Sequence, residues 1–160
     1  MPFDSVFGLP FHPLIVHGAV VLVPLAVIAA VALNWRPSWR TQYGLWIALF
    51  AWGAWVFAYA AVLTGDGLER FVRDRAVAAG DPRPRFGDHP EIGQTAALVA
   101  FAFALACTAL FAAHRWGDRY SLPKWSANAI YVALVLLAIP TMYFMLDAGH
   151  SGAKLAWGTP

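Results

Sequence analysis

Four long apolar stretches alternate with polar segments along the chain. They cover about residues 14–33, 44–64, 92–113 and 127–147, and apart from Asp147 at the end of the last one they contain no charged residue. A helix that crosses the roughly 30 Å hydrocarbon core of a bilayer needs about 20 apolar residues. Backbone groups in lipid must also be paired within the protein, and the period-2 alternation of a membrane β-barrel is absent. The pattern predicts an all-α integral membrane four-helix bundle, with residues 1–160 forming a single domain.

Proline and glycine mark the expected helix ends. His12-Pro13 opens the first span and His89-Pro90 the third, since proline is tolerated at the first helical positions. Gly65-Asp66 is expected to end the second span, and Gly149-His150-Ser151-Gly152 to form a turn or C-cap after the fourth. These paired signals indicate two helical hairpins that repeat each other in parallel.

The segment between the second and third spans is longer than the other two connections. In residues 68–79 the apolar positions fall on one helical face, which predicts a short separate helix in the headgroup region. Residues 81–85 read Asp-Pro-Arg-Pro-Arg and are expected to form a loop.

Composition supports a membrane protein and excludes several other classes. Hydrophobic residues make up 60% of the chain, against about 45–50% in soluble domains. A single cysteine, Cys107, excludes a disulfide scaffold. A net charge of +2 without a basic tract argues against a nucleic-acid partner. The lipid bilayer is therefore the expected surrounding, and homo-oligomerisation stays open.

The distribution of basic residues predicts which ends of the spans face the cytoplasm. The short first and third connections are dense in Lys and Arg, with only Asp118 opposing them: Arg36, Arg40, Arg115, Arg119 and Lys124. Since cytoplasmic loops carry an excess of positive residues, we expect a bacterial inner-membrane protein with both termini outside.

The same topology gathers the histidines. The starts of spans one and three and the ends of spans two and four lie on one side of the membrane, which collects four of the five histidines: His12, His17, His89 and His150. Only His114 falls on the other side. Taken alone, His12 and His89 precede prolines and fit interfacial helix caps, whereas an ionisable group inside a span, such as His17, is costly and usually functional.

Imidazole is the commonest nitrogen ligand of iron, copper and zinc, and facing imidazoles inside a dry helical bundle are typical of b-type haem. The sequence therefore predicts haem b between the helices, with His17 and one of His89 or His150 as axial ligands and His12 as a further cofactor-binding candidate. Such a protein transfers electrons, with a membrane or periplasmic redox partner, rather than catalysing bond chemistry.

Two alternatives remain at this point. The first is a copper or zinc site or transporter built from His17, His89 and His150 with Asp66 or Asp88. The second is a non-catalytic subunit of a larger membrane redox complex, in which the histidines are only interfacial. A stripe of small residues on spans two and three fits a cofactor groove, but it fits close helix packing better; its members include Ala48, Ala51, Ala54, Ala58, Ala61 and Gly65, with Gly93, Ala97, Ala100 and Ala104 opposite.

The opening Phe11-His12-Pro13-Leu14-Ile15-Val16-His17-Gly18 and the closing Gly149-His150-Ser151-Gly152 resemble a bacterial four-span membrane family, domain of unknown function 2231. The resemblance runs from His12 to about Trp157, and His12, His17, His89 and His150 match the family's histidines. Ala153 departs from the family's closing Gly-His-x-Gly-Gly-x-Leu pattern. Members are fused to Rieske or cytochrome c modules, so the resemblance implies redox work in the membrane.

Overall fold

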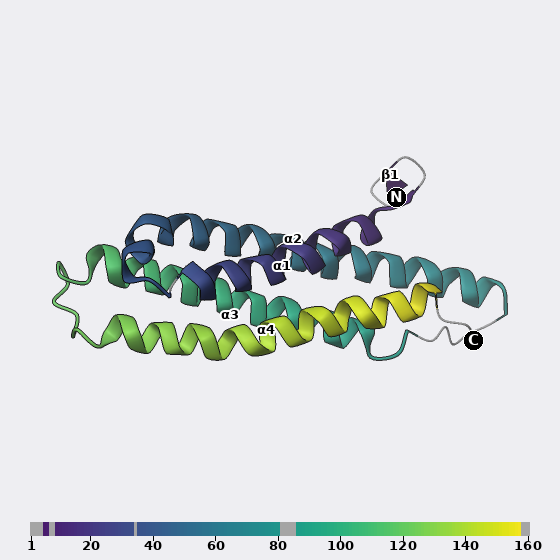
Figure 1. Ribbon diagram of the computed structural model, residues 1–160. Coiled ribbons are helices and arrows are strands. Elements are labelled where there is room, and N and C mark those ends of the chain that lie inside the picture. The colour runs from purple at the N-terminus through teal and green to yellow at the C-terminus, as the bar shows by residue number, and fades with distance from the viewer. Residues whose placement is uncertain (1–4, 7–8, 34, 81–85, 158–160) are drawn as a thin grey trace.

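The computed structural model describes residues 5–6, 9–33, 35–80 and 86–157 and contains four long helices packed side by side (Figure 1). The helices are α1 (Phe11–Leu33), α2 (Pro37–Ala78), α3 (His89–Trp116) and α4 (Ser126–Trp157). Two short strands, β1 (Ser5–Val6) and β2 (Leu9–Pro10), pair antiparallel before α1. All four helices are long and apolar enough to cross a membrane, which confirms the predicted all-α bundle. The expected loop at 81–85 lies outside the described residues.

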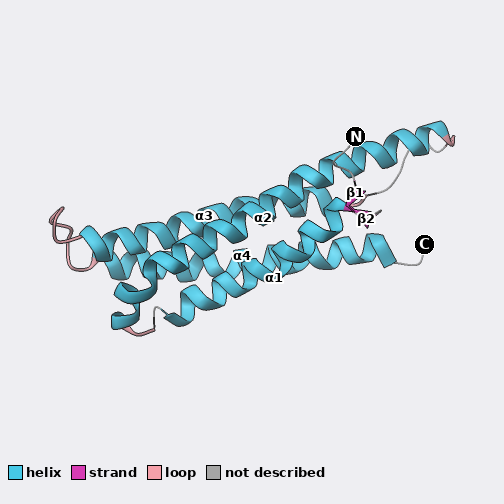
Figure 2. Cartoon of the chain, turned by 90° about the horizontal axis from the view of Figure 1, so that it is seen from above, coloured by secondary structure: helices cyan, strands magenta, loops and turns pink. Residues whose placement is uncertain are grey.

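The helices run up and down in sequence order. Each packs on its neighbour in sequence, and α1 closes the bundle against α4. The α1–α2 and α3–α4 connections lie at one end of the bundle, and the starts of α1 and α3 lie at the other, with the ends of α2 and α4 (Figures 1 and 2). We call these the basic end and the histidine end. The predicted arrangement of the spans is thus confirmed.

The predicted ends of the second and fourth helices are wrong. Gly65-Asp66 does not end the second helix, because α2 continues without a break to Ala78, so the predicted interfacial helix exists only as the last turns of α2. Gly149-His150-Ser151-Gly152 is not a turn either, because α4 runs on to Trp157. The true stop of α2 is Gly80, whose φ of +83° is the left-handed conformation that follows many helices.

Small side chains fill the centre of the bundle. Alanine supplies most of the buried positions on α2 and α3, among them Ala51, Ala54, Ala100 and Ala104. Because alanine lets two backbones approach closely, van der Waals contact between helices replaces the hydrophobic effect that is missing in lipid. The stripe of small residues therefore serves mainly as packing, as its spacing indicates.

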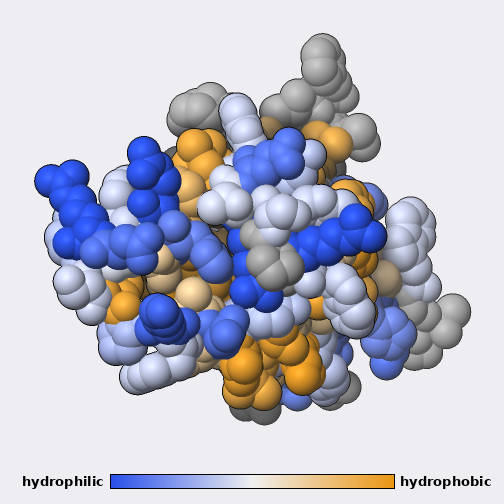
Figure 3. All heavy atoms as spheres, turned by 60° about the vertical axis from the view of Figure 1, so that its left-hand side comes forward, coloured by the Kyte–Doolittle hydropathy of each residue, from blue (hydrophilic) through white to orange (hydrophobic). Residues whose placement is uncertain are grey.

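Large apolar side chains face outward instead. Leu25, Val56, Leu98, Val132 and Ile139 are each exposed over about half or more of their surface. A water-facing surface of this kind would be unstable, so the bundle is built to lie in lipid. Hydrophilic residues cover much of the basic end, which Figure 3 brings forward.

The length of α2 leads to a test of how the bundle sits in the bilayer. Its 42 residues correspond to about 63 Å at 1.5 Å per residue, roughly twice the bilayer core. We expect the last turns, which carry the Glu69–Arg73 ion pair, to stand in water. In a Cys107→Ala background, Asp74→Cys should react with a membrane-impermeant maleimide in nanodiscs at least about ten-fold faster than the mid-span Val56→Cys, because a thiol in lipid does not ionise. Equal rates for the two variants would contradict this placement.

Candidate functional site

A cavity of about 680 Å³ lies at the histidine end and is lined by all four helices. Its volume is within the roughly 300–1,000 Å³ usual for ligand sites. The four histidines that the sequence places at this end all line it: His12, His17, His89 and His150. The four histidines therefore gather at this end as expected, and they line one cavity.

The closest pair among them is His12 of α1 and His89 of α3. Their ring centroids are 6.4 Å apart and the rings are inclined at 75°. In an up-and-down bundle α1 and α3 are diagonal partners, so the two imidazoles face each other across the bundle axis. Both side chains are only partly exposed.

Each of these imidazoles is anchored by a hydroxyl group on the next helix. His12 Nδ1 lies 3.1 Å from Thr64 Oγ1 of α2, and His89 Nδ1 lies 2.9 Å from Ser151 Oγ of α4. The Thr64 hydroxyl donates to the Ala60 and Ala61 carbonyls at 2.8 and 3.1 Å. The Ser151 hydroxyl likewise donates to the Ala148 carbonyl at 3.2 Å.

These bonds point to one tautomer. A hydroxyl has one proton. If the Thr64 and Ser151 hydroxyls give that proton to their backbone carbonyls, each oxygen accepts from the ring, and Nδ1 carries the hydrogen in His12 and His89. Nε2 then keeps its lone pair, which is the form in which imidazole binds a metal. An outer partner that fixes the ring in this way is the usual companion of a metal-ligating histidine.

Glycine at positions 65 and 152 lets the imidazole rings of His12 and His89 lie against the backbones of α2 and α4. A Cβ at Gly65 would lie 3.1 Å from His12 Cε1, and one at Gly152 would lie 3.0 Å from His89 Cε1. The two hairpins thus repeat one arrangement. In each, a histidine that precedes a proline on the first helix contacts a hydroxyl residue that precedes a glycine on the second helix. The repeat pairs Thr64-Gly65 with Ser151-Gly152, and not Gly65-Asp66 with Gly149-His150 as the sequence pattern suggests.

His17 and His150 line the same cavity but have a different setting. Both are exposed. His17 Nδ1 donates to the Pro13 carbonyl of its own helix at 2.6 Å, which leaves Nε2 as an acceptor. Within residues 5–6, 9–33, 35–80 and 86–157, no three His, Cys, Asp or Glu side chains come close enough to hold a metal ion, so His17, His89 and His150 do not form such a group.

The walls of the cavity are mostly small or apolar. Ala58, Ala61, Gly93, Ala96 and Gly149 are among its lining residues, and Asp66 and Glu69 are its acidic lining residues. The outer portion of the small-residue stripe thus borders a space, while its inner portion packs helix on helix.

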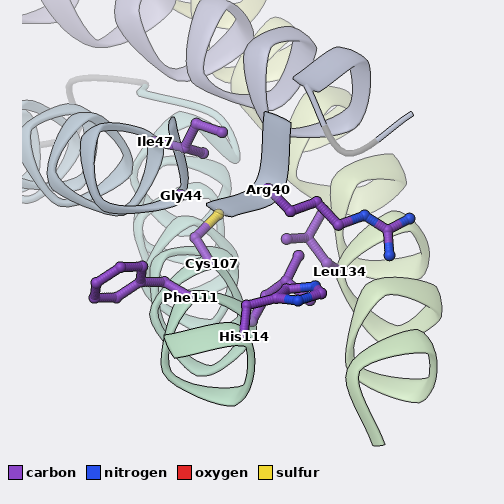
Figure 4. A pocket seen from close by; sticks show the side chains of 8 residues that line it. Arg40, Gly44, Ile47, Cys107, Phe111, His114 and Leu134 are labelled. Atoms are coloured by element: carbon purple, nitrogen blue, oxygen red, sulfur yellow. The ribbon is translucent and has the colours of Figure 1, made fainter. Parts of the chain in front are cut away.

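His114 lies at the basic end, as expected, beside a void of about 10 Å³ next to Arg40 and Cys107 (Figure 4). A space of that size holds at most one water molecule. In the part of the chain that the structure describes, His114 Nε2 is the one buried side-chain polar atom without a hydrogen-bond partner. His114 is separate from the cavity at the histidine end.

Sequence reasoning missed Thr64 and Ser151, which hold the two facing rings. The signal was present as a hydroxyl residue before glycine near the end of each hairpin. We expect Thr64→Val and Ser151→Ala to remove the acceptor for Nδ1–H and to mix the tautomers of His12 and His89, respectively. Nitrogen-15 NMR of histidine-labelled protein measures this, with Ser126→Ala at the basic end as control. Unchanged Nδ1–H signals in both variants would refute the assignment.

The chain matches the family model described as "Predicted membrane protein (DUF2231)" over residues 8–159. No curated protein and no solved structure shows significant similarity to it. The match covers nearly the whole chain, including all four helices and the four histidines of the cavity. By this match, the protein belongs to the DUF2231 family of membrane proteins.

Proposed function

We propose that this protein binds haem b in the cavity at the histidine end and carries electrons in the membrane. The observation that supports this best is the His12–His89 pair, two imidazoles from diagonal helices whose ring centroids lie 6.4 Å apart. When bound, haem supplies a one-electron carrier whose potential is set by its axial ligands and their hydrogen bonds.

The separation of the rings fits axial ligation. A metal–imidazole bond is about 2 Å long, so two rings on opposite sides of one metal have centroids roughly 6 Å apart. His12 and His89 have a centroid separation of 6.4 Å. On this separation, His12 and His89 would hold the haem iron, in preference to the expected pairing of His17 with His89 or His150.

The number of nearby ligands favours haem over a bare metal ion. Structural zinc takes four protein ligands and catalytic zinc three, whereas the porphyrin itself supplies four nitrogens to iron and leaves two axial positions for the protein. Two facing histidines therefore suffice for haem, and in the described residues no third His, Cys, Asp or Glu completes a metal-ion group with them. This is the reason for preferring haem to the copper or zinc site.

Absorption spectra of detergent-purified protein from haem-replete cells test the proposal. Wild type should show a Soret band and, after dithionite, a sharp α-band. His12→Ala and His89→Ala should each lose the six-coordinate spectrum, because one axial ligand is gone. His114→Ala is the matched control, since it removes an imidazole from the other end of the bundle and should keep the spectrum.

Two results would overturn the proposal. One is a colourless wild-type protein with no haem by extraction, and elemental analysis would then show whether copper or zinc is bound instead. The other is a full spectrum in the His12→Ala, His89→Ala double variant.

We also propose that the protein lies in a bacterial cytoplasmic membrane with the basic end inside. Arg36, Arg40, Arg115, Arg119 and Lys124 support this orientation through the positive-inside rule, which puts the cavity near the outer face, within reach of a membrane or periplasmic redox partner. Alkaline phosphatase fused after residue 160 should be active, whereas the same fusion at residue 121 should be inactive. The reverse result would invert the topology.

A further inference from the structure

His17 lines the cavity from inside a span. The Pro13 carbonyl can only accept, so the 2.6 Å contact requires hydrogen on Nδ1, and Nε2 of the neutral ring carries the lone pair. His17 is five residues further along α1 than His12, which is roughly 7.5 Å deeper along the helix axis. His17 is exposed, and lipid tails offer an exposed acceptor inside a span no donor.

The cavity is open toward lipid on the side of α1 and α4. Several lining residues that are also exposed belong to these two helices: Pro13 and His17 of α1, and Leu146, His150 and Leu155 of α4. Contact between α1 and α4 is also the least extensive among neighbouring helices. A molecule dissolved in the bilayer can therefore reach His17 without passing through water.

From these features we propose that His17 binds the hydroxyl group of a lipid-soluble hydroquinone that enters between α1 and α4. The inference rests on the proposed haem site. An apolar tail matches the apolar lining, and a phenolic hydroxyl supplies the donor that Nε2 accepts. Unlike other lipid alcohols, a hydroquinone also carries electrons that the neighbouring histidine pair is placed to receive through haem.

The reaction balances with one haem per chain. Oxidation of one hydroquinone to quinone would release two electrons and two protons, and haem held by His12 and His89 in each of two copies of the chain would accept one electron. The first proton goes to Nε2 of His17 and the second to water, and the quinone returns to the bilayer. A one-electron acceptor protein in water would take these electrons onward.

Anaerobic reduction by decylubiquinol in nanodiscs tests the inference. Wild-type haem should be reduced with two haems per hydroquinone. His17→Ala should keep its haem spectrum and its full reduction by dithionite, but its initial rate with decylubiquinol should fall at least about ten-fold, since Nε2 no longer takes the proton. His17→Gln should fall as far, because an amide cannot take that proton. His114→Ala should behave as wild type.

The outcomes separate this inference from the haem proposal. Haem present but reduced equally fast in wild type and His17→Ala overturns the hydroquinone site and leaves the haem site standing. Absence of haem overturns the haem site, and binding of decylubiquinol to wild-type and His17→Ala nanodiscs is then compared directly. Equal binding in that comparison overturns the His17 contact. Equal competition by a saturated alcohol of similar length overturns the hydroquinone assignment.

Discussion

Lipid gives backbone and side-chain polar groups no partner, and the rest of this structure depends on that constraint. It forces the spanning segments into helices, and it removes the hydrophobic drive that would press the helices together. Association then relies on close contact through Ala and Gly and on polar side chains that bond across helices. The His12–Thr64 and His89–Ser151 hydrogen bonds are contacts of this kind, and each ties together the two helices of one hairpin.

Repetition of this contact in both hairpins accounts for the position of the candidate site. Each hairpin contributes one imidazole whose Nδ1 is hydrogen-bonded to a hydroxyl group. Neither hairpin has a facing pair by itself, so the pair forms only when α1 and α3 meet across the bundle axis. The candidate site therefore depends on the fold as a whole, although all its anchoring bonds are made within hairpins.

The number, length and direction of the helices follow from the sequence, because charge-free apolar runs and lipid leave few choices. The ends of α2 and α4 do not follow from the sequence. Gly65 and Gly152 resemble residues that end a helix, but each lies inside a helix, at a position where an imidazole ring packs against the backbone. Glycine costs a helix interior roughly 1 kcal/mol, so sequence alone cannot distinguish these two uses. The His12–His89 pairing was missed for a related reason, because a position on one helix does not show which side chain faces it from another.

The two halves of the repeat are not equivalent, and the difference has a physical consequence. Thr64 is held by two carbonyl contacts at 2.8 and 3.1 Å, and its β-branched side chain has restricted rotation. Ser151 has one longer contact at 3.2 Å and no branch. The acceptor behind His12 is therefore fixed more firmly than the acceptor behind His89. His12 is therefore the more rigidly held ring of the pair, and His89 has more freedom to turn.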